Sequence, residues 1–393
     1  MSFRPRRIHV VLGYACNHKC RYCIQMLQDF PRAKPKQVSE ETLQTIRRAA
    51  DAIAPETLKV TLFGGEPLLY DEALITLLCR TERDNIKWKI HSNGELLDSF
   101  FVDLFNRFRV KFCLSHDGPQ VLKTRGTDVF ETNPELPALF NALEDRRVDC
   151  VITAHCLDLH ATHDFFEQKF GNENWYFNPA FLSNPGIVPK DLLAFDFAAW
   201  ESTVNRICES AERQILSGDT GRPQAWEAQF VLRALSDAAF PPKENPFIRA
   251  NERCLVPHVD LGGKLTYCER LEGGIHKAYE RVAPPLSPRR AFLDLSLSLH
   301  EHCSQCAAFA YCRGQCPVER PSAAPEQCRV LKTFFTACDE TFKRLSQTAP
   351  DKLLAAVHPF LPAEQARALQ PQEAHVDLTD RLSGLAQNFG RRQ

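Results

Sequence analysis

The chain has 393 residues, 44% of them apolar, so it is long enough for two or three domains with a buried core. Its 48 basic and 49 acidic residues balance, which argues against a role in binding nucleic acid or a membrane surface. No stretch approaches the roughly 18 apolar residues of a membrane helix, and the N-terminus lacks a signal-peptide pattern, so we expect a cytoplasmic protein.

Short β-like runs alternate with helix-like runs from residue 7 to about 182. The expected strands are 7–13, 58–64, 86–92, 110–116, 149–155 and 174–181, and the clearest helices between them are 39–54, 71–84 and 133–147. Ser39 is the expected N-cap of the first helix. Alternation of this kind predicts a parallel sheet with right-handed crossovers. Six units favour an α/β fold of the partial (β/α)6, TIM-like barrel type over a doubly wound sheet.

The rest of the chain changes character twice. We expect a barrel domain over 1–187, followed by a helical bridge over 188–250. Residues 251–345 are rich in cysteine and poor in regular periodicity, as expected of a small domain held together by metal. Residues 346–393 read as a tail of short helices.

Cys16, Cys20 and Cys23 form a C-x3-C-x2-C array directly after the first expected strand. Sites in parallel β/α folds lie at the carboxyl ends of strands. Three thiolates on a four-iron cluster would leave one iron open, which is how a metal centre is kept for chemistry rather than for structure. The alternative is a structural zinc ion with a distant fourth ligand.

The array, with Tyr22 before the last cysteine, resembles the C-x3-C-x-aromatic-C motif of the radical S-adenosylmethionine (SAM) superfamily. That resemblance implies a [4Fe–4S] cluster on Cys16, Cys20 and Cys23, whose open iron is chelated by SAM and which generates a 5′-deoxyadenosyl radical. It implies further SAM-binding residues, which are Tyr22 near the adenine, Gly64, Gly65 and Glu66 at the ammonium, and Asn93 and Ser115 along the pocket.

A second cysteine set follows at 254–328, and its spacing fits two zinc sites or two iron–sulfur clusters. It resembles the SPASM extension of radical SAM enzymes. The resemblance assigns Cys303, Cys306, Cys312 and Cys328 to one auxiliary [4Fe–4S] cluster, and Cys254, Cys268 and Cys316 to another. The fourth position of the latter is left open, or is filled by His258, Cys338 or a substrate group. Three [4Fe–4S] clusters are therefore expected in all.

Extra clusters suit a reaction that must dispose of an electron. A two-electron oxidation also needs a proton acceptor near the pocket. Glu269 and Asp117 are the candidate general bases.

The resemblance implies an enzyme that modifies a precursor peptide or protein, reduced by a flavodoxin- or ferredoxin-type donor. The preferred function is a peptide maturase that forms a thioether or carbon–carbon cross-link. The alternatives are a sulfatase maturase that oxidises Ser or Cys to formylglycine, and a non-enzymatic iron–sulfur electron-transfer protein. The first strand begins at residue 7, so we expect no separate leader-peptide domain before the barrel.

Overall fold

Within the part of the chain that the structure describes, eight strands form one curved sheet in the order β6-β5-β4-β3-β2-β1-β7-β8. The computed structural model describes residues 5–23, 25, 37–171, 174–182, 188–239, 256–266, 306 and 325–360. The strands are β1 (Arg7–Val11), β2 (Leu58–Phe63), β3 (Ile86–Ser92), β4 (Lys111–Ser115), β5 (Arg146–Ile152), β6 (Tyr176–Phe181), β7 (His258–Asp260) and β8 (Leu265–Thr266). All neighbours pair in parallel except β7 and β8, which form an antiparallel hairpin. The expected partial-barrel α/β fold is confirmed.

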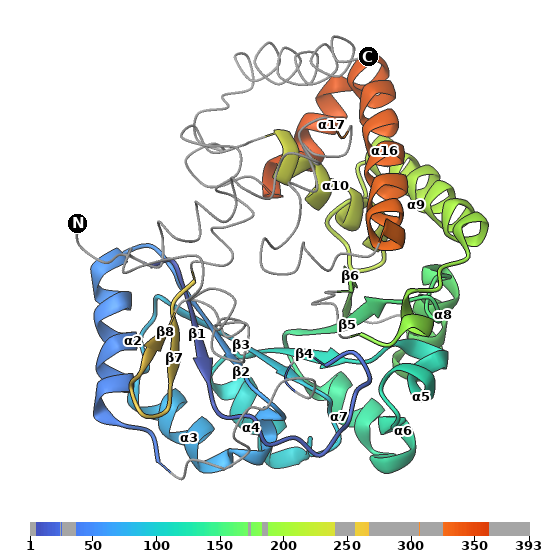
Figure 1. Cartoon of the computed structure of the whole chain (residues 1–393). Coiled ribbons are helices and arrows are strands. Elements are labelled where there is room, and N and C mark those ends of the chain that lie inside the picture. The colour runs from blue at the N-terminus through green and yellow to red at the C-terminus, as the bar shows by residue number, and fades with distance from the viewer. Residues whose placement is uncertain are drawn as a thin grey trace, which may run out of the picture.

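Helices cover the outer face of this sheet (Figure 1). They are α2 (Glu40–Ile53), α3 (Asp71–Arg80), α4 (Ser99–Arg107), α5 (Val121–Thr124), α6 (Val129–Thr132), α7 (Leu136–Ala142) and α8 (Leu159–Phe170), with the short 3-10 turns η1 (Pro67–Leu69) and η2 (Gly118–Gln120). Each joins consecutive parallel strands, so the carboxyl ends of β1–β6 meet at one edge of the sheet.

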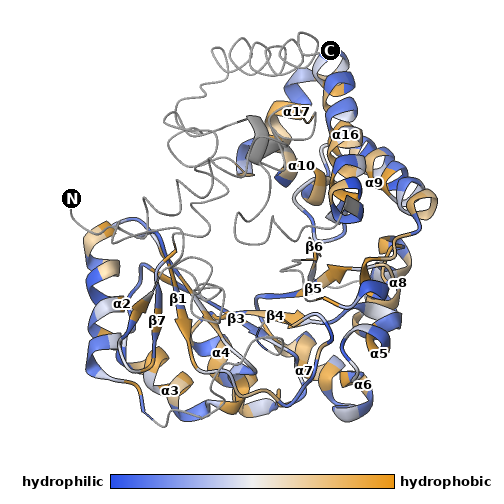
Figure 2. Ribbon diagram, in the orientation of Figure 1, coloured by the Kyte–Doolittle hydropathy of each residue, from blue (hydrophilic) through white to orange (hydrophobic). Residues whose placement is uncertain are grey.

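Strand alternation decides which side chains meet these helices. Ile8, Val60, Ile90 and Leu114 are completely buried in the core between sheet and helices. Figure 2 shows that the strands are largely apolar, whereas helices such as α2 carry many polar residues. The alternate strand residues, which include many polar ones, therefore point to the opposite side of the sheet, called here the concave face.

Ser39 caps α2 as predicted. Its side chain accepts the N–H of Thr42 at 3.2 Å, and Glu40 and Glu41 occupy the first turn. A capping oxygen satisfies a backbone donor that the helix leaves unpaired. The cap fixes where α2 begins after the loop that carries the cysteines.

The predicted boundary between the third long helix and the fifth strand was wrong. The helix expected over 133–147 ends at Ala142, and β5 begins at Arg146 instead of residue 149. Arg146 is buried on the core side of the strand, where its guanidinium donates to the carbonyl of Leu143 and lies over the ring of Phe140. Arg146 can thus occupy a core position because the aliphatic part of its side chain is apolar and its guanidinium has interaction partners.

A second group of helices packs beyond β6 (Figure 1). It comprises η3 (Lys190–Leu193), α9 (Phe197–Ser217), α10 (Trp226–Ala239), α16 (Pro325–Thr348), α17 (Pro350–Val357) and η5 (His358–Phe360). Trp200 of α9 is completely buried and donates its indole N–H to the carbonyl of Val330 in α16 at 3.0 Å. The bridge expected at 188–250 therefore packs against a helix that lies far along the chain.

Strand β7 comes from the range expected to hold the auxiliary clusters, yet it pairs with β1 in the barrel sheet. The domain division at 187, 250 and 345 stays a prediction. Among the described residues, none of the helices has the length and apolarity needed to cross a membrane.

Candidate functional site

The three cysteines of the first array lie in the loop after β1, at the carboxyl edge of the sheet. Cys16, Cys20 and Cys23 are half-buried, and none forms a disulfide. Two backbone donors shape the loop. The N–H of His18 points to Cys16 Sγ at 3.4 Å, and the N–H of Cys23 donates to the carbonyl of Cys20 at 3.1 Å. The array thus lies where parallel α/β folds bind their ligands.

The thiols of this loop are close enough to influence one another. Burial raises the pKa of Cys16 to about 12; the N–H of His18 opposes that rise, while the charges of Glu66, Cys20 and Cys23 add to it. Three thiolates gathered in a partly buried loop need compensating positive charge, which metal ions supply. The donor set therefore fits an iron–sulfur cluster held by three protein sulfurs.

Gly64 and Gly65, at the end of β2, pack directly on the segment of chain that leads into the cysteines. A Cβ on Gly64 would lie 2.1 Å from the carbonyl oxygen of Gly13, and one on Gly65 would lie 2.0 Å from that of Ala15. The N–H of Gly65 donates to Gly13 and that of Glu66 to Ala15, both at 2.8 Å. The close approach seen here is therefore between two backbone segments of the chain itself, which sets the position of the cysteine loop.

Glu66 follows these glycines and is only 1% exposed. Its carboxylate accepts the N–H of Leu68 at 3.0 Å, the hydroxyl of Ser92 at 2.8 Å and the N–H of Asn93 at 2.8 Å. Burial raises the pKa of Glu66 to about 7, although these three donors oppose the rise. A carboxylate offers about four acceptor sites, so one site remains for a cationic ligand.

Asn93, at the end of β3, binds the cysteine loop through its side chain. Its amide donates to Asn17 at 2.8 Å and accepts the N–H of Glu95 at 2.9 Å. Glu95 in turn contacts Asn17 and lies 2.9 Å from Nε2 of the buried His18. Asn17, His18 and Glu95 were not singled out from the sequence; the only signal for the first two was their position between Cys16 and Cys20.

Asp117 is completely buried and every part of its carboxylate is engaged. Arg125 pairs with it at 3.1 and 3.2 Å, the Tyr22 hydroxyl donates at 2.7 Å, Thr124 donates at 2.7 Å, and the N–H of Val151 donates at 3.0 Å. Burial alone would raise the pKa of Asp117, but Arg125 and these donors lower it overall. An ionised carboxylate with this many partners suits a positioning role better than that of a proton acceptor.

The same network reaches the cysteines. The Arg125 guanidinium lies 5.4 Å from the centre of the Tyr22 ring and 4.0 Å from Cys20 Sγ. Arg21, next to Cys20, makes a two-pronged ion pair with Asp191 of η3 at 2.8 and 2.9 Å. Arg125 and Arg21 thus hold the cysteine loop in place on both sides of Cys20. Tyr22 also packs on Leu182, Val188 and Leu192, and its expected place near an adenine stays a prediction.

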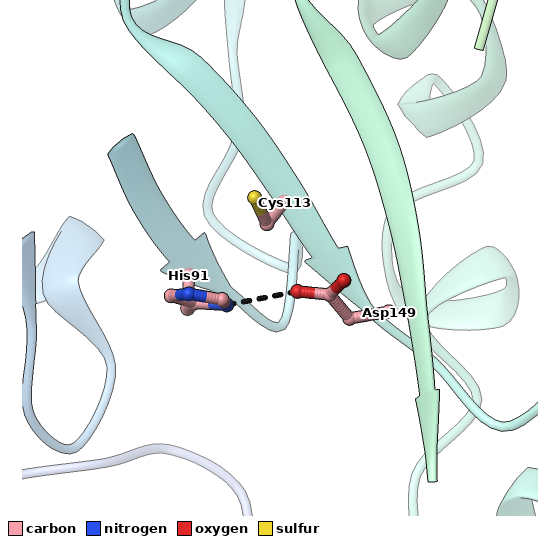
Figure 3. Close-up of side chains that lie close together, drawn as sticks. All are labelled: His91, Cys113 and Asp149. Atoms are coloured by element: carbon pink, nitrogen blue, oxygen red, sulfur yellow. Dashed lines mark ion pairs between the residues drawn. The ribbon is translucent and has the colours of Figure 1, made fainter. Parts of the chain in front are cut away.

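Ser115, at the end of β4, lies on the concave face in register with Asp149 of β5. Asp149 belongs to a group with His91 and Cys113 whose ligand atoms lie within 4.8 Å of one another (Figure 3). Asp149 lies within ion-pair distance of His91 Nδ1 at 2.9 Å and of Arg147 Nε at 2.8 Å. It accepts hydrogen bonds from Arg147 Nη2 at 3.0 Å and from the amide of Asn178 at 2.7 Å. Because Arg147 already neutralises this carboxylate, the group is a polar network rather than a cation site.

Most of the second cysteine set lies outside the described residues, as does Glu269; this applies to Cys254, Cys268, Cys303, Cys312 and Cys316. Cys306 packs against the main core, and Cys328 is exposed on α16. The two protein residues considered for a fourth ligand have other neighbours. His258 Nε2 lies 3.1 Å from His9 Nδ1, and Cys338 is buried against Cys208.

Residues 10–119, which hold the cysteine loop, Gly64–Glu66 and Asp117, match the Radical SAM superfamily. A cysteine-type anaerobic sulfatase-maturating enzyme of Clostridium perfringens is 23% identical over 376 residues, which span 85% of this chain and 95% of that protein. These similarities cover the barrel and extend well beyond it.

Solved structures share the fold. Histidine-tagged anSMEcpe with bound AdoMet matches with a TM-score of 0.63 at 20% identity, covering 89% of this chain and 97% of that one. Native anSMEcpe with bound AdoMet and the Cp18Cys peptide matches with a TM-score of 0.58 at 18% identity, covering 88% and 99%. Streptococcus suis SuiB bound to precursor peptide SuiA matches with a TM-score of 0.50 at 17% identity, covering 69% of this chain and 61% of SuiB.

The family match indicates an enzyme, so a role limited to electron transfer is set aside. The cysteine motif, the strand-end geometry and the fold agree with that match, which places a Radical SAM superfamily domain at residues 10–119 of an enzyme built on a partial barrel.

Proposed function

We propose that this enzyme oxidises a residue of a peptide or protein substrate by radical SAM chemistry. The single observation that carries the proposal is the Cys16–Cys23 loop fastened to Gly65 and Glu66 at the carboxyl edge of a radical SAM barrel. Support for a polypeptide substrate comes from the relatives, whose structures include anSMEcpe with a peptide and SuiB with its precursor peptide.

The chain's own residues have separate tasks in this proposal. Cys16, Cys20 and Cys23 hold the cluster, and when bound, cluster and SAM together supply a 5′-deoxyadenosyl radical. Glu66 receives the ammonium of SAM on its remaining acceptor site. Asn93 and Ser115 line the pocket. Arg125, fixed by Asp117, places positive charge beside Cys20.

The two polypeptide reactions differ in their support. A sulfatase-type oxidation of Ser or Cys to formylglycine fits at least as well as the cross-linking reaction preferred from the sequence. The sulfatase-maturating relative is matched over 95% of its length, whereas SuiB is matched over 61%. We therefore place formylglycine formation first and cross-link formation second.

Three [4Fe–4S] clusters remain part of the proposal, with the auxiliary pair on the cysteines of 254–328. Since His258 and Cys338 have neighbours of their own, we favour an open position on the Cys254, Cys268 and Cys316 cluster. Glu269 becomes the first candidate for the general base, because Asp117 is fully engaged. A flavodoxin- or ferredoxin-type protein is the proposed reductant.

The test combines metal content with product analysis. The reconstituted chain should contain about twelve irons, and Cys16, Cys20 and Cys23 changed together to Ala should remove about four and abolish 5′-deoxyadenosine formation. Candidate peptides are then incubated with the enzyme, SAM and a reductant. Formylglycine is an aldehyde and reacts with a hydrazide probe, whereas a thioether or carbon–carbon cross-link does not react with the probe. A reconstituted wild-type chain that makes no 5′-deoxyadenosine would overturn the proposal.

A further inference from the structure

The concave face of the sheet carries many more cations than acids. Its positions on β1–β5 follow from strand alternation, because the intervening residues are buried against the helices. The cations at these positions are Arg7, Lys59, Lys87, Lys89, Lys111 and Arg147, and the acid is Asp149. Like charges concentrated on one face of a neutral chain call for an anionic partner.

These cations lie directly opposite one another on neighbouring strands. Arg7 is in register with Lys59, and Lys59 with Lys87, so three cations form one row across β1, β2 and β3. Lys89 is in register with Lys111 on β4. Directly opposed like charges destabilise a sheet. Burial lowers the pKa of Lys59, and the charges of Arg7 and Lys87 lower it further.

The acidic residues near this face already form ion pairs or hydrogen bonds with other residues. Asp149 is held by Arg147, His91 and Asn178, and Lys111 pairs with Asp145 at 2.9 Å. No carboxylate of the described residues lies within ion-pair distance of Arg7, Lys59, Lys87 or Lys89. Four cations of the concave face are therefore without an ion-pair partner among the described residues, although the charge of Asp149 acts on Lys89 from a greater distance.

Histidines of the same face do not change this balance. His9 and His258 contact each other, and burial lowers their pKa values to about 3 and about 4. Both rings are therefore neutral at ordinary pH and leave the neighbouring cations uncompensated.

The spacing of the cations suits an extended polypeptide. Lys87 and Lys89 are two residues apart on β3, a separation of roughly 6.6 Å, which is also the spacing of alternate side chains in an extended peptide. Lysines of neighbouring strands lie about 4.8 Å apart. Carboxylates on one side of an extended segment can thus meet several of these cations together.

We propose that the concave face binds side-chain carboxylates of an acidic segment of the substrate polypeptide, through Arg7, Lys59, Lys87 and Lys89. This inference rests on the proposed function, because it assigns the chemical class of the substrate segment that the same enzyme binds.

The test measures binding to the full-length, cluster-loaded chain by fluorescence anisotropy. The probes are two labelled, C-terminally amidated peptides, one of alternating Glu and Gly and one of alternating Gln and Gly. The Glu peptide should bind more tightly, and its affinity should fall as salt is added. Lys59→Gln with Lys87→Gln should raise the Kd of the Glu peptide by up to about fivefold per lysine. Lys89→Gln should act in the same direction.

The matched control is Lys123→Gln with Lys332→Gln, which removes the same charge from exposed positions on α5 and α16. It should leave the Kd unchanged. Equal affinity for the Glu and Gln peptides, or an equal loss in the control, would overturn the inference. Formation of 5′-deoxyadenosine is measured separately on every variant. If that reaction fails in the wild type while the Glu peptide still binds selectively, the proposed function fails and the acidic-segment site stands.

Discussion

Glu66 is a buried carboxylate with three donors and one acceptor site to spare. Its pKa of about 7 means that it binds a proton at mildly acidic pH and is ionised above neutrality. A ligand ammonium favours the ionised form. The affinity of the site for SAM should therefore be linked to pH through this one residue.

We expect SAM to bind about five- to sixfold more tightly at pH 7.5 than at pH 6. The ionised fraction of Glu66 rises about eightfold across its pKa, while the SAM amine, an α-amino group of pKa about 7.7–8.0, loses roughly a third of its protonated form. Calorimetric titration of the cluster-loaded chain measures the change. Glu66→Gln should flatten it, and Glu72→Gln, on the exposed face of α3, should keep it. A wild-type affinity that does not change with pH would contradict the assignment.

Asp117→Asn should destabilise the fold by about 3–5 kcal/mol, because Arg125 would keep a buried charge without its partner. Urea unfolding measures the loss. Asp103→Asn, at an exposed position of α4, is the control and should have little effect. The double change Asp117→Asn with Arg125→Gln should cost less than Asp117→Asn alone. A double variant that is less stable than the single one would refute the ion pair as the cause.

The role of a single residue could be predicted from the sequence only where the residue belongs to a recognisable motif. Glu66 and Asn93 were singled out from strand-end patterns, and the structure places both against the cysteine loop. Glu95 was missed because its partners, Asn17 and His18, lie nearly eighty residues earlier in the chain. Contacts between distant side chains leave no periodic or spacing signal in one sequence.

At the scale of elements, the end of β2 and the cysteine loop form one unit. Gly65→Ala should cost at least about 3 kcal/mol, the upper end of overpacking penalties, because its Cβ would collide with a backbone carbonyl that cannot rotate away. Iron content after reconstitution should fall with it. Gly221→Ala, where no atom lies within 4 Å of the added Cβ, is the control. Normal iron content and stability in Gly65→Ala would contradict this packing.

The start of α2 offers a milder test of local structure. Ser39→Ala should lower the free energy of unfolding by about 1 kcal/mol, since the N–H of Thr42 loses its acceptor. Chemical denaturation measures the difference. Ser202→Ala, at an exposed site inside α9, should change stability far less. If both variants were equally stable, the hydroxyl of Ser39 would not be acting as a cap.

Elements with strong periodicity were predicted closely, and those with mixed patterns were not. Strand β3 occupies the expected 86–92, and α2 differs from its expected range by one residue at each end. The helix-to-strand junction before β5 failed because two arginines, Arg146 and Arg147, looked like the polar end of a helix. Arg146 instead follows the alternation of the strand into the core.

For the whole molecule, the barrel was predictable because six strand–helix units repeat in order, and each leaves its own periodic signal. The pairing of segments that lie far apart in the sequence was not predictable. Strand β7 has three residues, too few to show alternation, and α9 meets α16 through a contact between Trp200 and Val330. Such pairings depend on the final packing rather than on local propensity.

The place of β7 beside β1 has a consequence during synthesis on the ribosome. Strand β1 emerges well before the strand that covers its free edge, which follows 249 residues later, as the contact between His9 and His258 shows. Until then β1 is an open sheet edge, the kind of surface through which chains pair with one another. A chain ending at residue 250 should therefore self-associate in sedimentation measurements under conditions in which the full chain does not. The hairpin of β7 and β8, which forms late, thus protects the edge of β1 from pairing with other chains. Production at lower temperature, or with a chaperone that shields strand edges, should therefore raise the yield of full-length protein.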